Sequence, residues 1–325
     1  MTGPGSSPID PAGVRRALRS AGLRARHGLS QNFLVDPDAL EAILAAAAPA
    51  PGRRVLEIGP GLGILTRALL EAGAAVTAVE LDAGLAGRLR DELVGAIERG
   101  ARDPDARGGL RLIEADVLDL DLGTLVRAPY DVVANLPYHI TSPVLHRLLD
   151  GAVPPPERAV LMLQREVAER IAAPPGAMSY LSVFVQYHAA VHVARIVPRT
   201  SFEPAPAVDS AIVVLDVRRD PAPLGPDDED GLWRLVQAGF RERRKMLHNV
   251  LARQLPVDAE RVASALAATG IDPDRRPQTL SVAEWLALRS ALGPIGTDDR
   301  GRRAPERARS AGRPAPVDGP PVGGR

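Results

Sequence analysis

The sequence predicts an α/β protein with a doubly wound, mostly parallel sheet, an antiparallel edge and a small all-helical carboxy-terminal domain. From Asp36 onward, short apolar runs alternate with helical stretches, which is the pattern of a parallel sheet covered by helices on both faces. Two later apolar runs follow one another closely, as in an antiparallel pair. Beyond them, the apolar residues that recur regularly have helical spacing.

The expected elements follow in chain order. A short helix is predicted near Val14–Ala21 and a longer one over Leu40–Ala48, which ends before a Pro51-Gly52 turn. The parallel strands are expected at the apolar runs Val55–Ile58, Ala75–Val79, Leu110–Ile113, Asp131–Ala134 and Ala159–Leu163. The antiparallel edge is expected to comprise Val191–Val197 and Ser210–Val217.

The carboxy-terminal part is helical. The Pro-rich, acidic stretch Pro221–Gly231 is interpreted as a linker. Helices are expected over Leu232–Leu255, Ala259–Thr269 and Val282–Leu292, the last capped by Ser281. The predicted organisation is an Arg-rich extension (1–27), a sheet-containing domain (28–220), a helical domain (221–292) and a disordered tail (293–325) with almost nothing to bury.

Composition excludes some classes of protein and places the charges. The chain has no cysteine, which rules out disulfides, thiolate nucleophiles and thiolate metal sites. No run of about 18 apolar residues and no apolar signal-peptide core is found, so we expect a cytoplasmic protein without a membrane partner. The net charge is zero, but positive charge clusters at two places: Arg15, Arg16, Arg19, Arg24 and Arg26, and Arg241, Arg243, Arg244 and Lys245. Nearly every cation is a guanidinium, a group suited to phosphate.

A glycine-rich turn joins the first parallel strand to the next helix. Glycine is needed at Gly59, Gly61 and Gly63 because the backbone must turn sharply and let a ligand approach closely. A dinucleotide fingerprint would place its third glycine one residue later, where Ile64 stands, so NAD is disfavoured. The early third glycine is typical of class I methyltransferases.

Two acids strengthen the prediction of a cofactor site. Glu80 ends the second parallel strand, about 20 residues after the loop, where a carboxylate can accept hydrogen bonds from ribose hydroxyls. Asp116 follows the third strand, where the adenine edge of a cofactor is expected. Each acid alone would suit a solvated loop, but both stand at successive strand ends on the edge of the sheet that binds ligands.

The fourth strand ends in the tetrapeptide Asn135-Leu136-Pro137-Tyr138. An adenine amine is a poor nucleophile because its lone pair is delocalised, so an enzyme that methylates it must orient the nitrogen with acceptors. The Asn135 carboxamide oxygen and the Leu136 carbonyl can accept its N–H groups, Pro137 stiffens the turn, and Tyr138 offers a ring face to the base.

A second aromatic, Phe202, stands in a proline-rich loop between two predicted strands and is expected to close the base from its other side. The chemistry requires positioning, with neither a metal nor a general base, and His139 is interpreted as a shaping residue.

Several motifs in order resemble one family: Ser30-Gln31-Asn32-Phe33-Leu34-Val35-Asp36, the Gly59 loop, Asn135–Pro143, Phe202–Ser210 and Phe240–Leu247. Over about residues 24–292 the chain resembles the ribosomal RNA adenine dimethyltransferases of the KsgA type, which also include the macrolide-resistance methyltransferases of large-subunit RNA. The resemblance departs at Ser30, Ala207 and Met246, where Gly, a basic residue and Thr are usual.

The resemblance implies that S-adenosylmethionine is the cofactor, contacted by Asn32 and Leu34 together with Gly59, Gly61, Gly63, Glu80, Asp116 and Asn135. The implied substrate is a pair of adjacent adenines in the loop of the last helix of small-subunit (16S) RNA in the immature 30S subunit, each dimethylated on N6. Arg241, Arg243, Arg244 and Lys245, on a cationic helix, would bind RNA backbone.

Two alternatives stay open. Some enzymes that modify one adenine of large-subunit (23S) RNA carry an Arg-rich tail similar to the one that begins at Arg300. The Leu136 form of the tetrapeptide with Tyr138 and the extended Arg241–Leu251 helix nevertheless favour the small-subunit target. A non-catalytic RNA-binding assembly factor on the same fold is disfavoured because the cofactor and tetrapeptide residues are all present. Nothing in the sequence indicates more than a monomer.

Overall fold

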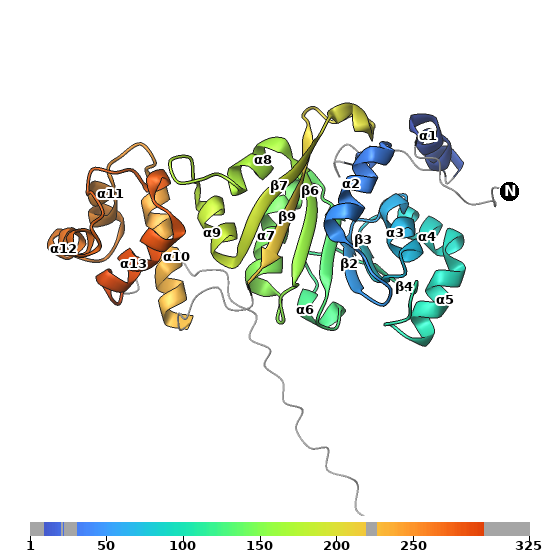
Figure 1. The fold of residues 1–325 in the computed structure, drawn as a ribbon, viewed down its shortest axis with the longest axis horizontal. Coiled ribbons are helices and arrows are strands. Elements are labelled where there is room, and N and C mark those ends of the chain that lie inside the picture. The colour runs from blue at the N-terminus through green and yellow to red at the C-terminus, as the bar shows by residue number, and fades with distance from the viewer. Residues whose placement is uncertain (1–9, 21, 23–30, 219–225, 296–325) are drawn as a thin grey trace, which may run out of the picture.

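A seven-stranded sheet forms the centre of the protein in a computed structural model that describes residues 10–20, 22, 31–218 and 226–295 (Figure 1). The strand order is β4 (Leu110–Glu114), β3 (Ala75–Glu80), β2 (Arg54–Ile58), β5 (Asp131–Asn135), β6 (Arg158–Gln164), β9 (Ser210–Val217) and β7 (Ala189–Val197). The first five strands are parallel, while β9 runs antiparallel to both β6 and β7. The predicted fold class, a parallel sheet with an antiparallel edge, is confirmed.

Successive strand residues face opposite sides of the sheet, and both sides are buried in the central strands β2, β3, β5, β6 and β9, whereas the edge strands β4 and β7 have exposed residues. Leu56 and Val132 belong to one apolar cluster, while their neighbours Val55 and Val133 belong to another. This alternation is the period of two of an extended chain. Because helices cover both faces of the central strands, these strands are mostly apolar runs, and their predicted bounds agree with the observed ones within one or two residues.

The helices around the sheet follow the chain in the expected alternation. They are α2 (Pro37–Ala47), α3 (Ile64–Glu71), α4 (Ala83–Glu92), α5 (Val94–Arg102), α6 (Leu122–Leu125), α7 (Thr141–His146), α8 (Arg165–Ile171) and α9 (Tyr180–His188). A π-helical turn, η3 (Arg147–Gly151), extends α7. The predicted amino-terminal helix is present as α1 (Pro11–Ser20), and a small sheet pairs β1 (Phe33–Leu34) with β8 (Phe202–Glu203). Among the described residues, no helix is long and apolar enough to cross a membrane.

A second apolar core lies in the carboxy-terminal part, between α10 (Pro226–Arg241), α11 (Leu247–Gln254), α12 (Ala259–Thr269) and α13 (Val282–Leu292). Its centre is Trp285, which is fully buried. The predicted cap of α13 is confirmed: the Ser281 hydroxyl accepts from Glu284 N at 3.2 Å, and Glu284 accepts from Ser281 N at 2.7 Å.

Two expectations about this part were wrong. The linker does not extend to Gly231, because α10 already begins at Pro226; Asp228–Asp230 form its first turns, where acids are favoured by the helix dipole. The single helix expected over Leu232–Leu255 is two helices, α10 and α11. The chain turns between them because Leu247 N donates to Arg275 O rather than to a preceding turn of helix.

This turn changes the position of the predicted RNA-binding cations. Arg243, Arg244 and Lys245 lie in the turn between α10 and α11 rather than on a continuous cationic helix, and Arg241 ends α10. Of the other expectations, those on Arg24, Arg26, Ser30 and the tail from residue 296 fall outside the described residues. The domain boundaries stay predictions.

Candidate active site

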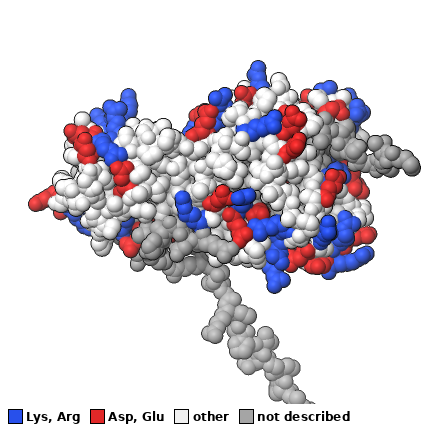
Figure 2. All heavy atoms as spheres, viewed as in Figure 1, with Lys and Arg blue, Asp and Glu red and all other residues white. Residues whose placement is uncertain are grey.

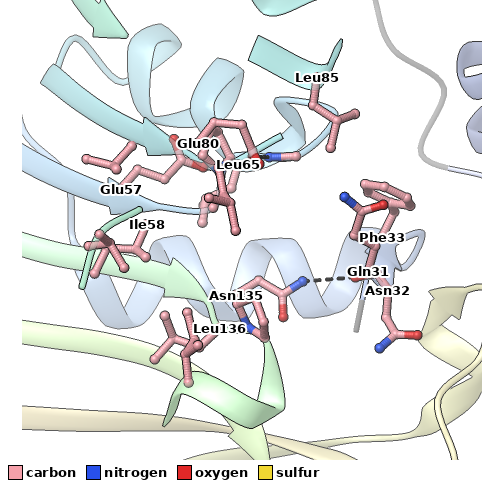
Figure 3. A pocket seen from close by; sticks show the side chains of 18 of the residues that line it. Gln31, Asn32, Phe33, Glu57, Ile58, Leu65, Glu80, Leu85, Asn135 and Leu136 are labelled. Carbon is pink, nitrogen blue, oxygen red and sulfur yellow. Dashed lines mark hydrogen bonds between the residues drawn. The ribbon is translucent and has the colours of Figure 1, made fainter. Parts of the chain in front are cut away.

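The carboxyl ends of β2, β3, β4 and β5 surround one pocket, about 1280 Å³ in empty volume when its open mouth is included (Figure 3). This is the edge of an open α/β sheet at which ligands bind. The pocket is lined by all but one of the residues that the sequence predicts for cofactor and catalysis: Asn32, Leu34, Gly59, Gly61, Glu80, Asp116, Asn135, Leu136, Pro137, Tyr138 and Phe202. His139 lines it too.

The exception is Gly63, the third glycine of the loop, which does not line the pocket. All three glycines have positive φ, with values of 69°, 58° and 76°, so each holds a left-handed conformation that other residues rarely adopt. A Cβ on Gly63 would meet Leu89 Cδ2 at 2.5 Å, whereas one on Gly61 would meet the Phe33 ring at 3.2 Å. Gly63 therefore serves the packing of α3 against α4, and Gly61 shapes the pocket.

Glu80 braces the glycine loop from the end of the neighbouring strand. One carboxylate oxygen accepts from Gly61 N at 2.9 Å, and the other accepts from Asp82 N at 2.9 Å. The side chain is 6% exposed, and burial raises the pKa of its carboxyl above the ordinary value. Each oxygen can accept a further hydrogen bond. At the next strand end, Asp116 Oδ1 accepts from Leu118 N at 2.8 Å and fixes that loop.

The orientation of Asn135 is set by the segment before β1. Its Nδ2 donates to Asn32 O at 3.2 Å, the dashed line in Figure 3. Because the amide nitrogen is engaged in this way, the carboxamide oxygen is the end available to accept a hydrogen bond from a ligand. The Tyr138 hydroxyl lies 2.9 Å from Ser210 Oγ, which anchors the half-buried ring to the start of β9.

Phe202 reaches the pocket from a different element than expected. It lies in the short strand β8, paired with Leu34, rather than in a loop. Its ring is 3% exposed and packs within one of the two cores of the sheet. The structure thus places both predicted aromatics, Tyr138 and Phe202, at one pocket.

Glu57 is a pocket residue that the sequence analysis missed. It lies on β2, is 1% exposed, and its Oε2 has no hydrogen-bond partner among the described residues. Complete burial, assisted by the charge of Glu80, raises the pKa of Glu57 from 4.5 to about 8. An acid inside the apolar run Val55–Ile58 was the available signal.

Glu57 gives a pH-dependent prediction. Between about pH 4.5 and 8 the folded protein holds a proton on this carboxyl that the unfolded chain releases, so Glu57 lowers the free energy of unfolding as pH rises. Glu57→Gln, which is neutral at every pH, is expected to be the more stable protein at pH 8, and its advantage over the wild type should grow by up to about 1.4 kcal/mol per pH unit.

Urea unfolding at pH 5.5, 7 and 8 measures this effect. The exposed acid Glu71 on α3 offers a matched control, and Glu71→Gln should follow the wild type at each pH. If the free energies of unfolding of Glu57→Gln and of the wild type differed by the same amount at all three pH values, Glu57 would be ionised in the folded protein.

The amino-terminal helix α1 also approaches the pocket. Val14 and Leu18 pack against Leu62 and Leu85 in one apolar cluster that includes Phe33. Arg15 pairs with Glu203 at 2.9 Å. The sequence predicted the helix but gave no sign that it covers the glycine loop.

The predicted RNA-binding cations are not at the pocket. Arg243, Arg244 and Lys245 are exposed, and none has an ion pair with a described residue, while Arg241 donates to Gln254 Oε1 at 2.9 Å. Figure 2 shows positive and negative side chains interspersed on the face in view rather than one continuous basic patch.

Comparison with known proteins identifies the family. The family model of ribosomal RNA adenine dimethylases matches residues 22–292. A ribosomal RNA small subunit methyltransferase A from Anaeromyxobacter dehalogenans (strain 2CP-C) is 44% identical over an alignment of 292 residues that covers 86% of this chain and 97% of the relative. The protein of that name from Geobacillus thermodenitrificans (strain NG80-2) is 38% identical over 88% of this chain and 97% of its own length.

Solved structures agree with this result. A dimethyladenosine transferase from Plasmodium falciparum superposes with a TM-score of 0.65 at 26% identity, covering 79% of this chain and 95% of its own. The 23S rRNA methyltransferase ErmE superposes with a TM-score of 0.63 at 30% identity, covering 80% and 99%. The chain is a methyltransferase and belongs to the ribosomal RNA adenine dimethylase family.

Proposed function

We propose that this protein transfers methyl groups from S-adenosylmethionine to N6 of two adjacent adenines in the 3′-terminal hairpin loop of small-subunit ribosomal RNA. The observation that carries the proposal is the carboxamide of Asn135, which lines the pocket and donates its Nδ2 to Asn32 O, so that its oxygen is the end available to a ligand. The names of the curated relatives support the small-subunit target.

The pocket suits a cationic cofactor. Glu57 and Glu80 are buried carboxyl groups on neighbouring strands, and Glu57 Oε2 has no partner among the described residues. S-adenosylmethionine brings a sulfonium and an ammonium group, and positive charges beside buried carboxyl groups favour the ionised carboxylates, so the bound cofactor would lower the raised pKa values of Glu57 and Glu80. In this proposal Glu80 accepts from the ribose, Asp116 lies at the adenine, and the Gly59–Gly61 backbone together with Asn32 and Leu34 shapes the remaining walls.

The bound cofactor supplies an activated methyl group; the chain positions the base. Asn135 Oδ1 and the Leu136 carbonyl accept the N–H groups of the adenine amine and aim its nitrogen at the methyl carbon. Tyr138 and Phe202 hold the ring by stacking, an interaction worth about 1–3 kcal/mol per base. Transfer of the methyl group to this nitrogen would leave neutral S-adenosylhomocysteine, and water would accept the proton that the methylated amine loses. Positioning of this kind can lower a barrier by about 7–11 kcal/mol.

Methyl transfer to two RNA substrates in parallel tests the proposal. Undermethylated small subunits and naked large-subunit RNA are incubated with labelled S-adenosylmethionine, and the digested nucleosides are analysed by mass spectrometry. Dimethyladenosine at two adjacent small-subunit positions is expected. Product on large-subunit RNA alone would assign the activity named for ErmE, and no product on either would favour a binding factor.

We further propose that residues 221–292 bind RNA backbone while residues 28–220 catalyse, and that the protein acts as a monomer on immature 30S subunits in the cytoplasm. The exposed cations Arg243, Arg244 and Lys245 support the first part, because they extend from a turn with no described acid paired to them. Arg241 adds a fourth charge at the end of α10.

Changing these cations is expected to weaken RNA binding through its electrostatic part. Binding weakens as salt rises, so the observed association constant Kobs falls with salt concentration. The triple change Arg243→Gln, Arg244→Gln and Lys245→Gln should make the slope of log Kobs against log salt shallower by about 2–3, because each lost phosphate contact contributes about 0.7–0.9 to its magnitude. Binding titrations at several salt concentrations measure the slope.

The matched control removes three exposed guanidiniums from the sheet domain: Arg90, Arg102 and Arg127, each replaced by Gln. It should leave the slope within error of the wild-type value. Equal slopes for the two triple variants would mean that the turn between α10 and α11 makes no RNA contact.

A further inference from the structure

A histidine and two acids meet near the amino ends of the parallel strands, whereas the pocket lies at their carboxyl ends. Asp150 lies on the π-turn η3, His188 ends α9, and Glu229 lies in the first turns of α10. One ligand-type atom of each residue, a ring nitrogen or a carboxylate oxygen, lies within 4.8 Å of the other two. These atoms come from three elements widely separated in sequence.

The strand register shows that the cluster and the pocket lie at opposite ends of the parallel strands. His188 directly precedes β7, whose first residue pairs with Val217 of β9. Arg158, the first residue of β6, pairs with the neighbouring Asp216. The cluster therefore lies at the amino ends of the parallel strands, whereas the pocket lies at their carboxyl ends, and the two share no residue.

His188 is a buried residue with one ring nitrogen that makes no hydrogen bond to the described residues. It is 5% exposed, and its Nε2 is inaccessible and makes no hydrogen bond with the described residues. Leaving such a buried group without a hydrogen bond destabilises the folded protein. The ring is held by aromatic neighbours, with centroids at 4.7 Å from Phe184 and at 5.9 Å from Trp233, which stacks at 22°. An imidazole fixed in this way is preorganised as a ligand.

The backbone that carries Asp150 is also unusual. Residues 147–151 form a π-helical turn, a rare geometry that is frequently found at functional sites. Here it brings an exposed carboxylate to the buried imidazole. The feature is independent of the missing hydrogen bond of His188, and both point to the same place.

We propose that Asp150, His188 and Glu229 bind a divalent transition-metal ion of the zinc type. One imidazole and two carboxylates are a donor set that zinc accepts, with water completing four-coordination. A centre equidistant from atoms 4.8 Å apart lies about 2.8 Å from each, so the ligands must approach by under about 1 Å to reach zinc distances of about 2.0–2.2 Å. Asp150 is exposed and Glu229 is half-buried, so small side-chain rotations can bring the carboxylates this much closer.

The ion joins two parts of the chain. Glu229 belongs to α10, which begins the second core, while Asp150 and His188 belong to elements packed on the sheet. Helices α9 and α10 are in contact. A metal here fixes α10, and with it the turn that carries Arg243–Lys245, relative to the catalytic pocket. The site is structural, and the expectation that catalysis needs no metal is unaffected.

Zinc titration of the full-length chain tests the site. The protein is stripped with a chelator, dialysed, and titrated with Zn²⁺ by calorimetry, with thermal unfolding followed in parallel. We expect about one equivalent bound and a higher melting temperature with zinc. The double variant Asp150→Asn/Glu229→Gln keeps the core intact and removes two ligands, so its affinity should fall by more than about 100-fold and zinc should not raise its melting temperature.

Control variants separate this site from adventitious binding. Glu98→Gln/Asp119→Asn removes two exposed acids elsewhere, and His192→Gln removes an exposed imidazole on β7; both should bind zinc like the wild type. His188→Gln serves as a second site variant if it folds. A wild type that takes up well under one equivalent would overturn the proposal, and so would a double variant that binds as tightly as the wild type.

Discussion

Replacing Asn135 by alanine is expected to slow methyl transfer by about 10²–10³-fold while RNA binding stays unchanged, which is the size of effect seen when one preorganised polar group is removed from an active site. The carboxamide stands at the end of β5, and its Nδ2 is held by Asn32 O. Alanine removes the acceptor that orients the adenine amine. The remaining acceptor, the Leu136 carbonyl, cannot fix the direction of the nitrogen alone.

Single-turnover transfer to undermethylated small subunits, at saturating labelled cofactor, measures the effect. RNA affinity is measured separately by filter binding. Asn249→Ala removes an exposed carboxamide from α11 and should transfer methyl groups at the wild-type rate. Full activity in Asn135→Ala would remove this residue from the mechanism, and loss of RNA binding would give it a structural role.

The central strands of the sheet could be predicted from the sequence because they are buried on both faces. Val132 and Leu161 are fully buried, and their runs contain no polar interruption that could shift the strand ends. The helical part was less predictable. Leu235 and Val236 of α10 and Val250 and Leu251 of α11 are all buried. Their apolar spacing continues across the turn as it would along one helix, so the sequence predicted a single helix. No Gly or Pro marks the turn between α10 and α11, which is produced by tertiary contacts.

The pocket residues also divide into those that the local sequence pattern predicts and those whose place depends on tertiary contacts. Asn135 and Glu80 were predictable because their strand ends were, and strand ends meet at one edge of a parallel sheet. Glu57 was missed because the burial of its carboxyl depends on the strands beside β2, which periodicity does not show. Phe202 was predicted to lie at the site, but its pairing in β8 depends on Leu34, far away in sequence.

Replacing Glu80 by alanine is expected to weaken S-adenosylmethionine binding by about 10²-fold or more. The carboxylate accepts hydrogen bonds from Gly61 N and Asp82 N, both at 2.9 Å. Alanine leaves these two N–H groups without their acceptor, at about 1–3 kcal/mol each, and removes the acceptor proposed for the ribose. The glycine loop should lose its fixed shape, so the melting temperature should fall as well. Glu80→Gln keeps one acceptor oxygen and should give an intermediate affinity.

The neighbouring strand provides a matched control for this prediction. Glu114 is the register partner of Glu80 at the end of β4, but it is exposed, and within the described part of the chain its ion pair is with Arg90 on the surface. Surface pairs contribute about 0–1 kcal/mol, so Glu114→Ala should bind the cofactor like the wild type. Calorimetry with S-adenosylmethionine compares the three variants. If Glu80→Ala and Glu114→Ala bound the cofactor equally well, the buried carboxylate would serve neither the loop nor the ribose, because the two positions differ mainly in burial and in the backbone groups they hold.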